Sequence, residues 1–226
     1  MPSISSRKVG KYLVERPAAE VTLMNIAFHF DIRFPPESPD DFVWSIAGDV
    51  LLYDSSTDNP LKVGTISAHY IDLTSWAAFS EDYPSYTAFD VFDAHSAELS
   101  EVYTYVMNKS GCLKRRLCSS LAQDIRYLDR VTVDAERRGQ GIGSQIVPFF
   151  IRSAGRRAAI TVVRPWPFEL NPDRNATAPP DASLVGSGVR RLRRFYRRIG
   201  FRPLGRGPFM YHDSAWPLHL PDGREL

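Results

Sequence analysis

Cysteine is scarce in this chain of 226 residues. Only Cys112 and Cys118 occur, both within the segment CLKRRLC, and two cysteines are too few for a disulfide framework. They form no CxxC pair and have no histidine near them, so the sequence does not indicate a zinc site. We therefore expect two free thiols, as is usual in the reducing cytoplasm.

Long apolar runs are also missing. No segment approaches the roughly 18 apolar residues needed to cross a bilayer. Residues 1–20, MPSISSRKVGKYLVERPAAE, lack the apolar core of a signal peptide. The formal net charge is only +2, so a charged partner must be recognised by a local patch. These absences predict a cytoplasmic protein without membrane attachment.

Two common phosphate-binding loops are absent, although a glycine-rich turn is present. The segment RRGQGIG, residues 137–143, follows a strand pattern and precedes a helix pattern. A Walker loop requires GxxxxGK[ST], and no lysine precedes Ser144. A dinucleotide fingerprint requires GxGxxG, and counting from Gly139 its last position is again Ser144. The unpaired N–H groups at a helix start nevertheless favour an anion at such a turn.

The hydrophobic pattern predicts a single domain of mixed α and β structure over residues 1–226, with insertions at about 74–124 and 165–186. β-branched and aromatic residues indicate strands at 21–34, 42–53, 63–73 and 125–133, and in the segments AAITVV and PFMYH. Apolar residues at helical spacing indicate a helix that begins near Asp93 or Ser96, one after the glycine turn, and a last one with the stripe Val189, Leu192, Tyr196 and Ile199.

Two motifs resemble the signatures of the GNAT superfamily of N-acyltransferases. Arg138, Gly141 and Gly143 meet the pattern R-x-x-G-x-G, which resembles the loop that binds the coenzyme A pyrophosphate in that family. The segment FYRRIGFRPL, residues 195–204, resembles its aromatic pair on a helix followed by Gly-Phe. The alternative is a glycine turn that only lets a helix pack on its strand. The resemblance implies an α+β fold with a central mixed, mostly antiparallel sheet, flanking helices and a splayed strand pair for coenzyme A.

The resemblance further implies an acetyl-CoA-dependent N-acetyltransferase that requires no metal. A primary amine of unknown identity would attack the thioester directly in a ternary complex. Coenzyme contacts would come from Val131, Thr132, Val133, Arg138, Gly139, Gln140, Gly141, Ile142, Gly143 and Ser144. The strand residues would act through a backbone N–H that polarises the thioester carbonyl, so the side chain of Val133 should matter little.

Tyr196 resembles the family's general acid, the phenol that protonates the departing thiolate. A phenol has an ordinary pKa near 10 and stays protonated at neutral pH, which suits this role. The spacing of Tyr196 from Leu192 and Ile199 equally fits a residue that only fills the apolar stripe of its helix.

Asp129 matches the family's general base, a carboxylate on the strand before the loop. Strand alternation predicts that it lies on the same face as Val131 and Val133. The alternative is a charge that pairs with Arg126 or Arg130 at the strand edge.

Two other features could contribute to an acceptor site. His69, in ISAHY, could shuttle a proton, although a lone histidine in a hairpin is more often structural. By position, the insertion at 165–186 could overhang the acceptor and contact it through Trp166, Phe168 and Glu169. A surface loop without a role explains the same segment equally well.

Residues 187–206 carry eight arginines and no acidic residue: Arg190, Arg191, Arg193, Arg194, Arg197, Arg198, Arg202 and Arg206. The apolar stripe leaves these arginines on the outer side of the helix, which is typical of a solvated face. The alternative is a surface for nucleic acid, which would make the chain an RNA-binding protein or an acyltransferase acting on an RNA-borne amine. No pattern indicates the oligomeric state.

Overall fold

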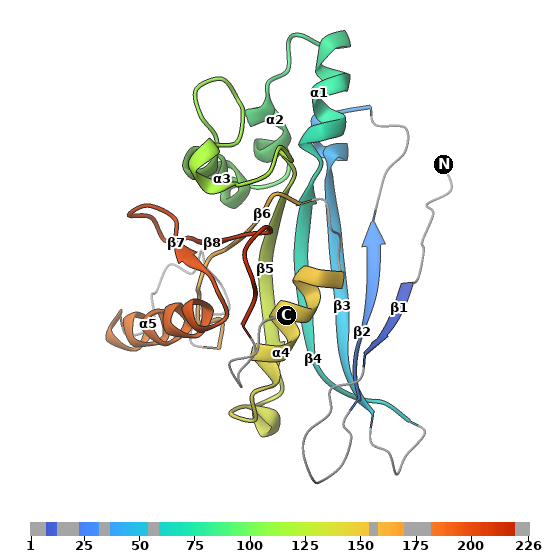
Figure 1. Cartoon of the computed structure of the whole chain (residues 1–226), viewed down its shortest axis with the longest axis vertical. Coiled ribbons are helices and arrows are strands. Elements are labelled where there is room, and N and C mark those ends of the chain that lie inside the picture. The colour runs from blue at the N-terminus through green and yellow to red at the C-terminus, as the bar shows by residue number, and fades with distance from the viewer. Residues whose placement is uncertain are drawn as a thin grey trace.

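One mixed sheet forms the centre of the computed structural model, which describes residues 8–12, 23–31, 37–53, 59–153, 158–169 and 182–219 (Figure 1). In these residues eight strands follow the order β1-β2-β3-β4-β5-β6-β8-β7. The strands are β1 Lys8–Tyr12, β2 Leu23–Asp31, β3 Val43–Tyr53, β4 Leu61–Ile71, β5 Ile125–Val133, β6 Ile160–Val163, β7 Arg202–Pro203 and β8 Met210–Asp213. Among the strand pairs of the described chain, β5 and β6 alone run parallel. The predicted mixed, mostly antiparallel sheet is confirmed.

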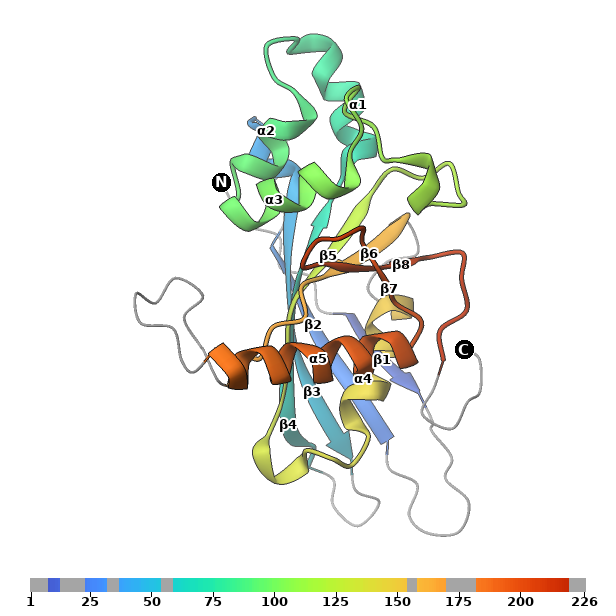
Figure 2. The same ribbon diagram turned by 90° about the vertical axis from the view of Figure 1, so that its left-hand side faces the viewer.

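Five α-helices flank this sheet in the described part of the chain. They are α1 Leu73–Asp82, α2 Ala88–Asp93, α3 Ala97–Val106, α4 Ile142–Ser153 and α5 Ala182–Arg198. Figure 1 shows α1, α2 and α3 gathered at one end of the molecule, whereas α4 lies over the middle of the sheet. In the turned view of Figure 2, α5 crosses in front of the strands close to α4.

Two apolar clusters cover the two faces of the sheet, because neighbouring strand residues point to opposite sides. One cluster contains Ala68 and Leu128 and packs against α4 and α5. The other contains Ile71, Ile125 and Tyr127 and packs against α1, α2 and α3. The turn between β5 and α4 therefore belongs to the α4 and α5 side of the molecule.

Local capping explains where the helices begin. The Ser96 hydroxyl accepts a hydrogen bond from the Leu99 N–H at 3.2 Å, so α3 starts where the sequence predicts. Asp72 caps α1 in the same way, at 2.9 Å from the Ser75 N–H. The sequence pattern did not predict α1, α2 or the strand β1. Helix α5 begins at Ala182, inside the predicted insertion, and residues 170–181 of that insertion lie outside the described chain.

Candidate functional site

A strand, a glycine turn and a helix follow one another directly at the predicted coenzyme loop. Strand β5 ends at Val133, a short 3-10 turn spans Ala135–Arg137, and α4 begins at Ile142. Gly139 and Gly141 have φ angles of 78° and 79°, a left-handed backbone conformation that residues with a side chain rarely adopt. In the described chain the backbone N–H groups of residues 139–141 donate to no other residue. These groups and the first turn of α4 form a set of free donors suited to an anion.

Side chains of the turn hold its backbone in place. The Arg138 Nε donates to the Val133 carbonyl at 3.0 Å, which folds this side chain back over the end of β5. The Gln140 amide donates to the Glu136 carbonyl at 3.3 Å. The Ser144 hydroxyl donates to the Gly141 carbonyl at 2.6 Å. The turn is therefore braced by its own side chains, while the N–H groups of residues 139–141 have no protein partner in the described chain.

The side chains at the end of β5 are used within the protein. The Thr132 hydroxyl lies 2.7 Å from the Thr65 hydroxyl on β4. Val131 and Val133 pack against the cluster that contains α4 and α5. Any contribution of these three residues to a ligand must therefore come from their backbone, which is the role that the resemblance implies for them.

Strands β5 and β6 pair over only part of their length. The first pair is Ile125 with Ile160, and the last pair is Leu128 with Val163, where β6 ends. Beyond a bulge, residues 130–133 of β5 continue and pair with β4 alone. In the described chain no strand pairs with this part of β5 on the β6 side. In the described chain the parting therefore leaves this end of β5, next to the glycine turn, without a strand partner on its β6 side.

A β-bulge in β5 corrects the predicted position of Asp129. Arg130 pairs with Ser67 and Leu128 pairs with Ala68, so Asp129 is the extra residue between two ladder pairs. Its carboxylate accepts a hydrogen bond from the Ser67 hydroxyl at 2.9 Å. Ser67 lies on the opposite face of β4 from Ala68, which belongs to the α4 and α5 cluster. Asp129 therefore lies on the opposite face from Val131 and Val133, because the extra residue reverses the alternation.

Imidazole groups lie on the same face as Asp129. The His69 ring lies 4.4 Å from the His95 ring, centroid to centroid, and its Nδ1 is 3.5 Å from the Ser45 hydroxyl. Burial is the main cause that lowers the pKa of His69 to about 4; His95 lowers it further and Asp129 opposes the shift. Burial also lowers the pKa of His95. His69 is therefore neutral at physiological pH and can accept a hydrogen bond or a proton.

Tyr196 lies in the core of the α4 and α5 side. Its side chain is 6% exposed, and its ring packs edge-on against Phe195 and Phe201 at centroid distances of 5.0 and 5.3 Å. Burial raises the pKa of its phenol, so Tyr196 stays protonated over the whole range of ordinary assays. The structure thus shows the packing role and leaves the acid role as a prediction.

Tyr127 is a residue of this region that the motifs did not indicate. It lies on β5 two positions before Asp129, and its ring stacks on His69 at 6.4 Å. Its hydroxyl is buried and makes no hydrogen bond with the described residues. Burial is the main cause that raises the pKa of this phenol, followed by the charge of Asp129, while Tyr196 adds a smaller contribution. In the sequence, only its position two residues before Asp129 in the same strand pattern could have indicated it.

The segment after β6 reaches the part of β5 that does not pair with β6. The Phe168 ring lies 4.1 Å from the guanidinium of Arg130 on β5. Glu169 contacts Arg138 of the glycine turn at 3.7 Å and Arg191 of α5 at 2.8 Å. Glu169 therefore lies beside the glycine turn, and its contact with an acceptor stays a prediction.

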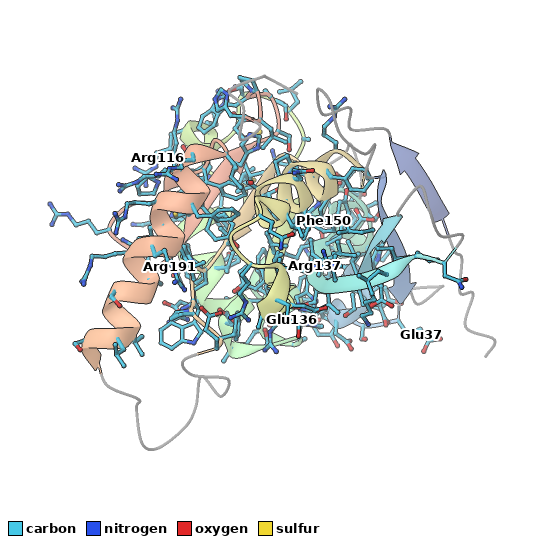
Figure 3. All side chains as sticks on the ribbon, turned by 90° about the horizontal axis from the view of Figure 1, so that it is seen from below. Glu37, Arg116, Glu136, Arg137, Phe150 and Arg191 are labelled. Atoms are coloured by element: carbon cyan, nitrogen blue, oxygen red, sulfur yellow. The ribbon has the colours of Figure 1, made fainter. Side chains whose placement is uncertain are left out.

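The arginines of α5 lie on its outer side, as predicted. Tyr196 and Ile199 are buried, and Arg190, Arg194, Arg197 and Arg198 are exposed. Arg193 is partly buried and donates to the Gly207 carbonyl at 2.9 Å. Figure 3 shows α5 next to α4 from below, with Arg191 labelled on α5 and Arg137 labelled at the turn before α4.

The described residues carry neither a metal-ion cluster nor a membrane-spanning helix. They contain no group of three or more His, Cys, Asp or Glu residues placed to hold a metal ion. None of their helices combines the length and the apolar character that crossing a bilayer requires. Cys112 and Cys118 are both free thiols.

Comparisons with known proteins identify no relative: no family model, no curated protein and no solved structure matches the chain. The resemblance to the acyltransferase family therefore depends on its two sequence motifs.

Proposed function

We propose that this protein is an N-acyltransferase that moves an acetyl group from acetyl-CoA to a primary amine by direct attack in a ternary complex. The observation that carries the proposal is the joint position of two features at the end of β5. The positive-φ turn at Gly139 and Gly141 leads into α4, and the last residues of β5 have no strand partner on the β6 side. Together they offer an anion site beside a strand edge.

The donor would use both features at once. Free N–H groups of the turn and of the first turn of α4 bind its diphosphate, since the helix dipole favours negative charge there. The amide-bearing arm of the coenzyme extends along residues 129–133 and pairs with them as a strand would. A backbone N–H of this stretch donates to the thioester oxygen and stabilises the charge that develops on it.

Transfer of the acetyl group requires that one proton is removed from the amine and that one proton is supplied to the departing thiolate. The amine nitrogen attacks the thioester carbon, the new C–N bond forms, and the C–S bond breaks as the tetrahedral intermediate collapses. Asp129 is the proposed base that takes the amine proton, directly or through water, with neutral His69 on the same face. Tyr196 is the proposed acid that gives its proton to the departing thiolate.

A calorimetric titration with acetyl-CoA tests the proposal, together with a screen of primary amines in which release of free thiol is followed. We expect saturable binding with one site per chain, and thiol release that depends on one class of amine. Absence of heat with acetyl-CoA on folded protein would contradict the proposal. Binding without amine-dependent thiol release would contradict the assigned acceptor chemistry.

A second candidate function follows from the exposed arginines of α5. Arg190, Arg194, Arg197 and Arg198 are exposed along one helix, and several guanidinium groups in a row can neutralise the phosphates of RNA. We expect any such binding to weaken steeply with salt, by about tenfold or more between 50 and 200 mM. A fluorescence titration with labelled single-stranded RNA at these two salt concentrations measures it, and no binding at the lower one removes this candidate.

A further inference from the structure

A cavity of about 650 Å³ lies against α5 beside the glycine turn. Arg191, Arg194 and Arg198 line it, together with Phe195 and Glu169. Residues three and four apart on a helix share one side, so the three guanidinium groups face the same space. The cavity is therefore basic, with one aromatic ring in its wall.

The charges in this cavity are only partly compensated. Glu169 pairs with Arg191 at 2.8 Å. Arg194 and Arg198 make no hydrogen bond or ion pair with any described residue. Three positive charges against one carboxylate leave an excess that favours an anion of about two charges. The Glu169 side chain is 40% exposed, so solvent screens its ion pair with Arg191. An anionic ligand can therefore replace Glu169 as the partner of Arg191.

The cavity adjoins the predicted diphosphate site. A Cβ placed on Gly143, in the first turn of α4, would lie 3.7 Å from the Phe195 ring that lines the cavity. Glu169 connects the two places as well, since it also contacts Arg138 of the turn at 3.7 Å. One ligand with two separate phosphate groups could therefore occupy both.

We propose that this cavity binds a phosphate monoester on the nucleotide end of the acyl donor. The inference rests on the proposed function and specifies its donor. A monoester carries close to two negative charges at neutral pH, and paired guanidinium groups of Arg194 and Arg198 can bind its oxygens with charge-assisted hydrogen bonds. Coenzyme A has such a phosphate on its ribose, apart from its diphosphate. A thioester on a carrier protein lacks it, so the cavity selects free coenzyme A thioesters.

Calorimetry with coenzyme A and with dephospho-coenzyme A tests the proposal on the full chain. We expect coenzyme A to bind about 10- to 100-fold more tightly, the range that charged hydrogen bonds supply. The double variant Arg194→Gln, Arg198→Gln should bind both compounds with nearly the same affinity, because only the monoester uses these groups. A matched control is Arg115→Gln with Arg116→Gln, which removes two exposed charges outside the cavity and should keep the preference (Figure 3 labels Arg116).

The outcomes separate this inference from the proposed function. Equal affinity of the unmodified chain for the two compounds overturns the phosphate site and leaves the acyltransferase proposal intact. A preference that survives in the Arg194 and Arg198 variant overturns the assignment to this cavity. Failure of both compounds to bind overturns the two proposals together. Circular dichroism of each variant shows that lost affinity does not come from lost folding.

Discussion

Replacing Tyr196 with phenylalanine should lower kcat about 10²- to 10⁴-fold, the usual contribution of a positioned proton donor. The fold should survive, because the Tyr196 ring supplies the packing against Phe195 and Phe201 and the substitution keeps that ring. Affinity for acetyl-CoA should change little, since the phenol acts on the thiolate that forms only during the reaction. Thiol release under saturating acetyl-CoA and amine measures the effect.

The pH dependence gives a second test of the same residue. Burial raises the pKa of the Tyr196 phenol, so its proton is retained as the pH rises and is lost only beyond the ordinary range. Activity that depends on Tyr196 should therefore show no loss at basic pH below about pH 10.

Tyr211→Phe is a matched control for the Tyr196→Phe substitution, because Tyr211 is also buried but lies on β8 in the other apolar cluster. Undiminished turnover in Tyr196→Phe would contradict the acid role.

The strand β5, the glycine turn and the helix α4 could be predicted because their signals are local. β-branched residues end at Val133, glycines follow at positions with positive φ, and apolar residues then recur at helical spacing. The cap of α3 at Ser96 is local in the same sense. Each of these features depends on a few neighbouring residues, so no knowledge of the tertiary structure was needed.

The face of Asp129 could not be predicted, because it depends on a bulge. Nothing in the β5 sequence IRYLDRVTV marks Asp129 as the extra residue. The position of the bulge is set by the pairing of β5 with β4, a strand far away in the sequence. One inserted residue reverses every later side chain of the strand. The bulge separates the proposed base from the core side that holds Val131 and Val133, and places it with Ser67 and His69.

Long-range contacts also explain why the motifs missed Tyr127 and why the sequence did not show the partners of Glu169. Tyr127 matters because its buried hydroxyl makes no hydrogen bond with the described residues and its ring stacks on His69 of β4. Glu169 matters because two arginines, one from the turn and one from α5, meet its carboxylate. Both relations join segments that are distant in the sequence, which spacing and composition cannot reveal.

Replacing Gly141 with valine should weaken acetyl-CoA binding about 10- to 100-fold. Gly141 has a φ of 79°, and a β-branched residue in this conformation is strained by roughly 1 to 3 kcal/mol. The backbone would relieve this strain by rotating, and the N–H groups of the turn would no longer converge on one anion. The measurement is the dissociation constant of acetyl-CoA by calorimetry.

Gly205 provides the matched control for this substitution. It has a φ of 62° in the turn before β8, and a Cβ there would meet nothing within 4 Å. Gly205→Val introduces the same kind of strain away from the coenzyme loop, so it should lower the melting temperature without changing the affinity for acetyl-CoA. If the two variants lose affinity equally, the loss reflects general destabilisation and the anion site at the turn is refuted. If only Gly141→Val loses it, the geometry of this one turn controls binding of the donor, because strain alone is common to both.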